Sequence, residues 1–342
     1  MRNACRLGFL PQRGLLCCLV ALAALAALAT WPAVARSETV ALDRLVSAVV
    51  HVKTTINPEG RSVDALGRER DGTGIVIDDS GLILTIGYLM VEAQSAEVIT
   101  NDGRAVAAAV VGYDHETGFG LLRAIMPLNV HALPLGRSAD LKEQQPVMVA
   151  GYGGPDRLAP ALVVSKREFA GSWEYLLDEA IFTAPPYPAW SGAALIDHLG
   201  KLVGVGSLVV GDVSGHGDGP GNMFVPIDRL PPILADLIAD GRAAGPGRPW
   251  IGVTTREAGG RLVVVSVAEG GPAERAGVRH GDVIVGVGGA APKDMADFYR
   301  KIYSRGVAGV TIPLDVRRND EQQHFDVKSM NRLDHLRLRS TY

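Results

Sequence analysis

Cysteine, aromatic residues and excess basic charge are all scarce in this sequence. The three cysteines, Cys5, Cys17 and Cys18, lie within the first 35 of 342 residues, so the rest of the chain has no disulfide, thiol nucleophile or cysteine-based metal site. Aromatic residues make up 6% of the chain, and the formal net charge is −3, which gives no field that attracts nucleic acid. We therefore expect no nucleic-acid partner, no metal site and no cofactor.

Glycine and proline, in contrast, are plentiful. The chain has 41 glycines and 20 prolines, with 47% hydrophobic and 21% charged residues. This composition excludes a disordered, collagen-like or coiled-coil protein, and the length suffices for about two domains with cores of their own. Frequent turn residues favour a mainly β architecture over a helical bundle.

Residues 1–35 have the pattern of a secretory signal peptide. Three arginines precede an apolar run from Leu15 to Ala29, and Ala33-Val34-Ala35 supplies a small-x-small cleavage motif. Cleavage would leave a cysteine-free chain with a formal net charge of −6, suited to the bacterial periplasm. The alternative is a retained membrane anchor, but the apolar run is short for a span and no second stretch is long enough to cross a bilayer.

Residues 38–240 consist mainly of short apolar runs separated by turn signals. Residues 38–48 have helical spacing, whereas 57–71 is polar and predicts a loop. Two successive hairpins, with turns at 78–81 and 101–103, indicate antiparallel structure of the barrel or sandwich type. The predicted strands are Val49–Lys53, Thr73–Ile77, Leu82–Thr85, Ala96–Thr100, Ala105–Val111, Pro146–Ala150, Ala161–Val164, Ala194–Ile196 and Lys201–Val210.

A second module follows a helix at Pro231–Leu237 and a Gly/Pro-rich linker at 241–249. Residues 250–330 alternate strands with a short helix at Pro272–Ala276 and an amphipathic helix at Asp294–Arg305, which predicts a small α+β fold. The tail, 331–342, is charged, and we expect it to be loose.

Several phrases resemble the HtrA-type exported serine proteases, which include the DegP-like and DegS-like proteins. The resemblance covers nearly all of 38–330 and implies a trypsin-like double β-barrel over 38–240, followed by a PDZ domain over 250–330. The barrel phrases are Gly72–Asp78, Ser80–Thr85, Asp102–Arg104, Val111–Asp114, Ser191-Gly192, Gly200–Val205 and Phe224–Pro226. The PDZ phrases are Trp250–Val253, Gly271–Val278 and Gly281–Ile284.

The resemblance implies a Ser–His–Asp relay, but two of its three positions have changed. The serine is retained as Ser191, whereas the histidine position holds Tyr88 and the aspartate position holds Gly118. A phenol with a pKa of about 10 is neutral at pH 7 and is no ordinary general base. Ala189 also replaces the glycine two residues before the serine, which puts the oxyanion hole in question.

Two other side chains are candidate replacement bases for Ser191. His115 lies three residues before Gly118, although an exposed loop histidine is the simpler interpretation. Lys166 would form a Ser–Lys pair, but no local motif supports it. Trp190, beside the serine, is expected to cover the cleft, and Tyr88 is interpreted as a packing residue or a substrate contact.

The PDZ phrases keep the features that peptide binding needs. PDZ domains add a C-terminal peptide as an extra strand and bind its carboxylate with loop N–H groups. The resemblance assigns these roles to Trp250, Ile251, Gly252 and Val253, with Phe298 and Ile302 from the second helix lining the pocket.

The sequence therefore predicts a periplasmic HtrA-like pseudoprotease that binds unfolded or C-terminal peptide segments in envelope protein quality control. It would act as a chaperone, as an adaptor, or as a regulator that assembles with an active relative. One alternative is an active serine endopeptidase that uses Ser191 with a rearranged base, and another is a structural partner that uses neither site. No aromatic residue occurs in residues 36–70, which argues against the family's trimer and leaves other oligomers open.

Overall fold

Two six-stranded barrels and a five-stranded sheet make up the part of the chain that the structure describes. The structure is a computed structural model that describes residues 42–338, and residues 42–47 are helical. The predicted signal peptide, 1–35, lies outside the described residues. Leu45 and the described residues after it form one compact unit.

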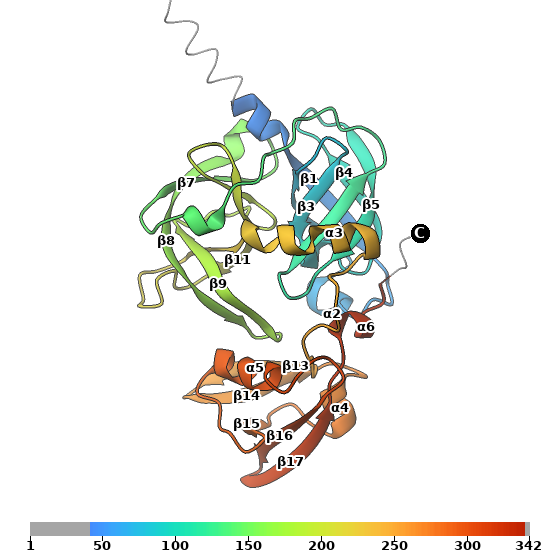
Figure 1. Cartoon of the computed structure of the whole chain (residues 1–342), viewed down its shortest axis with the longest axis vertical. Coiled ribbons are helices and arrows are strands. Elements are labelled where there is room, and N and C mark those ends of the chain that lie inside the picture. The colour runs from blue at the N-terminus through green and yellow to red at the C-terminus, as the bar shows by residue number, and fades with distance from the viewer. Residues whose placement is uncertain (1–41, 339–342) are drawn as a thin grey trace, which may run out of the picture. The chain divides into compact units, whose positions relative to one another are not determined.

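The first barrel closes in the strand order β1-β2-β3-β6-β5-β4 (Figure 1). The predicted turn at 78–81 joins β2 to β3, because the Asp78 carboxylate accepts the N–H groups of Ser80 and Leu82 at 2.9 Å. Both predicted hairpins are present. The elements are β1 (Val49–Ile56), α2 (Val63–Leu66), β2 (Glu69–Val76), β3 (Leu82–Ile86), η1 (Gly87–Leu89), β4 (Ala93–Ile99), β5 (Ala105–Tyr113) and β6 (Phe119–Ala124).

The second barrel closes in the order β10-β11-β12-β9-β8-β7. Its longest strands, β8 and β9, form a hairpin whose tip spans residues 171–175. The 3-10 turns η2 (Ser138–Asp140), η3 (Pro155–Arg157) and η4 (Ile227–Arg229) lie in its connections. The strands are β7 (Pro146–Ala150), β8 (Leu158–Gly171), β9 (Tyr175–Ala184), β10 (Ala194–Ile196), β11 (Leu202–Val210) and β12 (Gly221–Pro226).

Helix α3 (Pro231–Asp240) precedes the C-terminal α+β domain. Its sheet has the order β13-β14-β15-β16-β17, so β13 is an edge strand. Helix α5 begins after Asp294, whose carboxylate caps the Asp297 N–H. The elements are β13 (Val253–Ala258), β14 (Arg261–Val267), α4 (Pro272–Ala276), β15 (Val283–Val287), α5 (Met295–Tyr303), β16 (Thr311–Arg318), β17 (Glu321–Lys328) and α6 (Arg332–His335).

The structure confirms the mainly β class and differs from the sequence predictions in three places. Residues 57–71, predicted as a loop, contain α2 and the start of β2, because the strand extends through its polar residues to pair with β1. Strands β6, β9 and β12 were not predicted. The tail is not loose over its described part, since α6 and the residues after it contact both the barrels and the PDZ-like domain.

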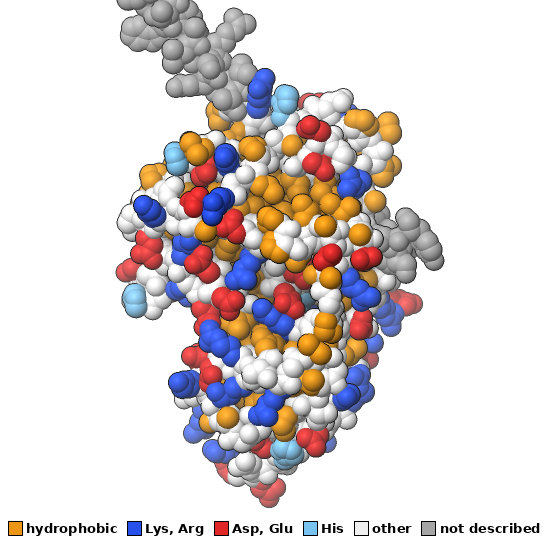
Figure 2. Space-filling view, viewed as in Figure 1, with side chains coloured by type: hydrophobic (Ala, Val, Ile, Leu, Met, Phe, Trp, Pro, Cys, Tyr) orange, Lys and Arg blue, Asp and Glu red, His pale blue; other side chains and the backbone are white. Residues whose placement is uncertain are grey.

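Charges of both signs are interspersed on the face shown in Figure 2, while hydrophobic side chains gather near α3. Among residues 42–338, no helix is both long and apolar enough to cross a bilayer.

Candidate functional site at Ser191 and in the peptide-binding loop

Ser191 lies in the tight turn between β9 and β10, packed directly on β2. Its carbonyl accepts the Thr73 N–H at 2.8 Å. The next residue, Gly192, has φ +74°, and a Cβ there would lie 2.0 Å from the Thr73 carbonyl oxygen. Only glycine fits this position, so the turn holds the Ser191 side chain in one place.

Ala189, two residues before Ser191, does not adopt the left-handed backbone conformation. Six non-glycine residues among 42–338 have positive φ, and Ala189 is not among them. A methyl side chain disfavours the left-handed conformation, which explains why φ is not positive at Ala189.

Tyr88, in η1, reaches the Ser191 hydroxyl. Its phenol oxygen lies 2.9 Å from Ser191 Oγ and 3.0 Å from the Ser207 carbonyl oxygen. A carbonyl only accepts, so the phenol proton goes to Ser207, and the Ser191 hydroxyl donates to the phenol oxygen. Burial raises the pKa of Tyr88 above its ordinary value. The phenol is therefore neutral, with no free base to take the serine proton.

A buried guanidinium fixes the position of Tyr88. Arg70 Nη1 donates to the Tyr88 carbonyl at 2.7 Å, and Nη2 donates to Ser62 Oγ at 2.8 Å. Ser62 in turn donates to the Glu92 carboxylate at 2.6 Å. Burial disfavours the charge on Glu92, but hydrogen bonds from Ser62, Arg337 and Arg61 outweigh it and lower its pKa. The loop that carries Tyr88 is thus held by a connected network.

Gly118, at the expected aspartate position, has a backbone conformation that residues with a side chain rarely adopt and a tight contact where a Cβ would lie. It has φ +80°, and a Cβ would lie 3.2 Å from the Tyr175 hydroxyl. That hydroxyl donates to the Thr117 carbonyl at 2.6 Å, so Tyr175 is itself fixed. The backbone of Gly118 also accepts the Gly87 N–H at 2.6 Å. Glycine is consequently part of the packing here.

His115 is not the exposed loop histidine that the sequence predicted. It is partly buried, and Arg332 Nη1 donates to its Nε2 at 2.9 Å. Nε2 therefore accepts, and Nδ1 carries the proton toward the Tyr113 hydroxyl at 3.1 Å. Burial, followed by the charge of Arg332, lowers the pKa of His115 well below its ordinary value. Both ring nitrogens have partners other than Ser191.

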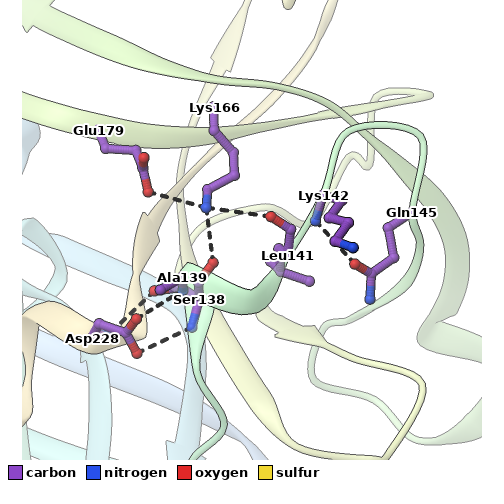
Figure 3. Close-up of polar contacts among 8 residues, drawn as sticks. All are labelled: Ser138, Ala139, Leu141, Lys142, Gln145, Lys166, Glu179 and Asp228. Carbon is purple, nitrogen blue, oxygen red and sulfur yellow. Dashed lines mark hydrogen bonds and ion pairs between the residues drawn. The ribbon is translucent and has the colours of Figure 1, made fainter.

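Lys166, the other base considered, is bound elsewhere in the second barrel (Figure 3). Its Nζ donates to the carbonyls of Ser138 and Leu141 at 3.1 and 3.4 Å and pairs with Glu179 at 3.2 Å. Asp228 holds the same turn by accepting the Ser138 and Ala139 N–H groups. The lysine therefore positions this turn, and the structure does not bring it together with Ser191.

A cavity of about 370 Å³ lies beside Tyr88. Trp190 and Tyr88, with ring centroids 6.3 Å apart, form part of its wall. The tail contributes Arg332 and Leu336 to the wall of the cavity. Arg332 also donates to the Trp173 carbonyl at 2.9 Å. The lining includes Ile86, Tyr88, Tyr113, His115, Gly118, Trp173, Tyr175, Trp190, Leu208, Arg332 and Leu336. The space around the expected His and Asp positions is thus an apolar, aromatic chamber.

The loop Trp250–Val253 presents consecutive backbone N–H groups to a single carboxylate. Glu174 Oε2 accepts from Ile251 at 2.9 Å, and Oε1 accepts from Gly252 and Val253 at 2.6 and 2.8 Å. Trp250 differs from the other three, because its N–H donates to the Met330 carbonyl. Glu174 was missed by sequence reasoning, since it is 77 residues from Ile251 and no local motif marks it.

Phe298 and Ile302 lie in α5 and are fully buried. They belong to one apolar cluster with Ile251 and Val253, and this cluster also contains Leu176 from β9. The two residues therefore form the floor on which the loop and the edge strand rest.

Two closed barrels with a serine turn between them, followed by an α+β domain with an N–H-lined loop, define a trypsin-like fold joined to a PDZ domain. Family models agree: residues 72–205 match the trypsin-like peptidase domain, and residues 249–329 match the PDZ domain. The solved structure of the HtrA-type protease AlgW with decapeptide aligns with a TM-score of 0.51, covering 87% of this chain and 98% of that one at 22% identity.

Curated relatives align with about three quarters of the chain. The putative serine protease HhoA of Synechocystis sp. is 28% identical over 298 residues, covering 79% of this chain and 74% of the relative. A probable periplasmic serine endoprotease DegP-like of Pseudomonas putida is 28% identical over 275 residues, covering 75% of this chain and 55% of the relative. The chain thus spans about half to three quarters of these proteins, and it belongs to the HtrA/DegP family.

Proposed function

We propose that this chain is a pseudoprotease that binds peptides through its PDZ domain. The observation that carries the proposal is the hydrogen-bond chain from Ser191 Oγ through the Tyr88 phenol to the Ser207 carbonyl. A serine hydroxyl needs a base that accepts its proton during attack. Here the neighbouring oxygen belongs to the Tyr88 phenol, which already carries a proton and whose pKa is raised by burial.

The magnitude of the expected loss supports this proposal. Removing the base of a serine protease lowers kcat by about 10⁶-fold, and removing the orienting carboxylate costs about 10⁴-fold. This chain has a phenol at the first position and, at the second, a glycine with φ +80°, a backbone that an aspartate would rarely adopt. Neither His115 nor Lys166 is placed to compensate.

Peptide binding is the function that the other domain supports. The N–H groups of Ile251, Gly252 and Val253 converge on one carboxylate, and β13 is an edge strand. This is the arrangement that binds a peptide C-terminus by β-addition. We extend the proposal to C-termini or unfolded segments of exported proteins, handled in the periplasm after cleavage of residues 1–35, alone or together with an active relative.

A casein assay tests the loss of proteolysis. The purified protein lacking residues 1–35 is incubated with unfolded casein beside Ser191→Ala and Tyr88→His variants. We expect no cleavage by any of the three, because a histidine at 88 would still lack a carboxylate partner at Gly118. Cleavage by the parent that Ser191→Ala abolishes would overturn the proposal and favour an active endopeptidase.

A peptide assay tests the binding function. Fluorescent decapeptides with random sequences, ending in Val, Leu or Phe with a free carboxylate, are compared with the same pool amidated at the C-terminus. We expect binding that the amidated pool lacks. Equal binding of both pools, or of neither, would contradict recognition of a C-terminal carboxylate.

A further inference from the structure

The tip of the β8–β9 hairpin lies along the edge strand of the PDZ domain. Thr255 of β13 donates its N–H to the Ser172 carbonyl at 2.9 Å. The sheet offers no other strand on that side of β13. The hairpin backbone therefore uses a hydrogen-bonding position that an added peptide strand would use.

The Glu174 side chain completes the likeness to a bound peptide. It is 3% exposed and accepts three consecutive N–H groups of the carboxylate loop. These bonds of 2.6–2.9 Å use the same donors that a C-terminal carboxylate requires. One set of N–H groups cannot serve both carboxylates at once.

Two tyrosines of α5 hold the hairpin backbone in place. The Tyr299 hydroxyl donates to the Gly171 carbonyl at 2.8 Å and accepts the Glu174 N–H at 3.2 Å. The Tyr303 hydroxyl donates to the Glu174 carbonyl at 3.3 Å. Leu176 then enters the apolar cluster of the PDZ domain. The hairpin thus supplies a strand, a carboxylate and an apolar side chain, the three features of a PDZ ligand.

We propose that the hairpin tip, residues 171–176, is an internal ligand of the PDZ domain, and that an incoming C-terminal peptide binds by displacing Glu174. This inference rests on the proposed peptide-binding function and defines how the same site is regulated. Because a peptide meets an occupied loop, its apparent affinity equals its intrinsic affinity multiplied by the fraction of molecules in which the loop is open. Removing the Glu174 carboxylate should raise that fraction and tighten binding.

The test compares four proteins lacking residues 1–35: the parent, Glu174→Gln, Glu174→Ala and Asp178→Asn. The glutamine keeps the size of the side chain, but its NH2 group replaces one carboxylate oxygen and cannot accept an N–H from the loop. Asp178 is the matched control, because it is an exposed carboxylate on the same hairpin that pairs with Arg229 at 3.4 Å, away from the PDZ loop. Glu174→Ala serves as a second variant with no acceptor at all, and a thermal melt establishes that each variant is folded.

The first measurement is hydrogen–deuterium exchange at the Ile251, Gly252 and Val253 amides without peptide. We expect these amides to exchange at least tenfold faster in Glu174→Gln and Glu174→Ala than in the parent, with Asp178→Asn unchanged. Equal exchange in all proteins would overturn the internal-ligand proposal, whatever the peptide assay gives.

The second measurement is the Kd for the free-carboxylate decapeptide pool. We expect a Kd at least tenfold lower for both Glu174 variants than for the parent and Asp178→Asn. Equal binding by all proteins would overturn displacement and leave the peptide-binding function standing. Absence of binding in every protein, with the exchange difference present, would overturn the peptide-binding function and displacement, and would leave only the docked hairpin.

Discussion

The Ser191 site and the Trp250–Val253 loop differ in which of their functional groups are present. At Ser191 the position of the nucleophile is kept, but a phenol and a glycine stand where a base and a carboxylate are expected. In the loop the binding groups are all present and point at a carboxylate, but that carboxylate is the chain's own Glu174. In our proposal, proteolysis is lost at the first site, whereas at the second site only the access of a peptide is limited.

This difference follows from what each function demands of side chains. Proton transfer requires particular side chains with suitable pKa values, so two substitutions suffice to end it. Carboxylate binding by a PDZ loop requires backbone N–H groups and one glycine that adopts φ +85° at Gly252. Backbone donors persist through most substitutions, and we expect binding to outlast catalysis in such a chain.

The largest effect is expected from Gly192→Ala, which tests whether the Ser191 turn is still a rigid part of the fold. Its Cβ would clash with the Thr73 carbonyl at 2.0 Å in a backbone with φ +74°. We expect a loss of about 3 kcal/mol or more in the free energy of unfolding, measured by chemical denaturation. Gly211→Ala is the control, because its Cβ would have no neighbour within 4 Å. Equal stability of the two variants would mean that the turn is loose.

A pH titration sharpens the comparison at the PDZ loop. Burial raises the pKa of Glu174 to about 7, against hydrogen bonds from Ile251, Val253 and Gly252 and the charge of Arg332. Its ordinary value is 4.5, so docking of the hairpin takes up a proton and is strengthened as pH falls through 7. Peptide affinity should therefore be about tenfold weaker at pH 6 than at pH 8.

Glu174→Gln provides the control for this pH dependence and should remove it. His115 and His335 are neutral throughout this window, since burial is the leading cause that lowers the pKa of each, to about 4 for His335. The hydroxyls of Tyr299 and Tyr303 are protonated there as well, because burial raises their pKa. The same pH dependence in the parent and in Glu174→Gln would assign it to another group.

Tyr299→Phe tests whether helix α5 holds the hairpin tip in place. The substitution removes the bonds to the Gly171 carbonyl and the Glu174 N–H and keeps the ring in the core. Each such bond contributes about 1 kcal/mol, so peptide affinity should rise about five- to thirtyfold as the hairpin undocks more readily. Tyr303→Phe, with a single bond of 3.3 Å, should give a weaker rise. An unchanged Kd in both variants would contradict the role of α5 in holding the tip.

Tyr88→Phe tests the hydrogen-bond chain at Ser191. The phenol oxygen is replaced by hydrogen, which leaves Ser191 Oγ and the Ser207 carbonyl without this partner. We expect a loss of about 1–2 kcal/mol in the free energy of unfolding and no gain of proteolysis. Appearance of casein cleavage in this variant would show that the phenol suppresses an otherwise competent serine.

The sequence allowed much of the fold to be predicted, and the reasons are local. Turns such as Asp78–Gly81 have strong side-chain and glycine signals, and the short apolar runs beside them became β2, β3, β4 and β5. Strand β9 was missed because Asp178 and Glu179 interrupt its apolar pattern. Such strands owe their formation to barrel closure, which a local pattern does not encode.

In the candidate site, too, only the residues with local sequence signals could be predicted. Tyr88, Gly118 and Ser191 could be located from short phrases, because each phrase keeps a fixed spacing to its strand. The roles of Glu174 and Arg332 depend on contacts between residues 77 and 217 positions apart in the chain. Neither residue stands in a motif, so only the folded chain brings the first to Ile251 and the second to His115.

Reaction with a fluorophosphonate tests the loss of catalysis most directly. This reagent labels serines that an adjacent base has activated, and mass spectrometry reports the adduct on the peptide that contains Ser191. We expect no adduct on the mature protein under conditions that fully label trypsin. A stoichiometric adduct at Ser191, absent from Ser191→Ala, would show that the serine is an active nucleophile and would contradict the account.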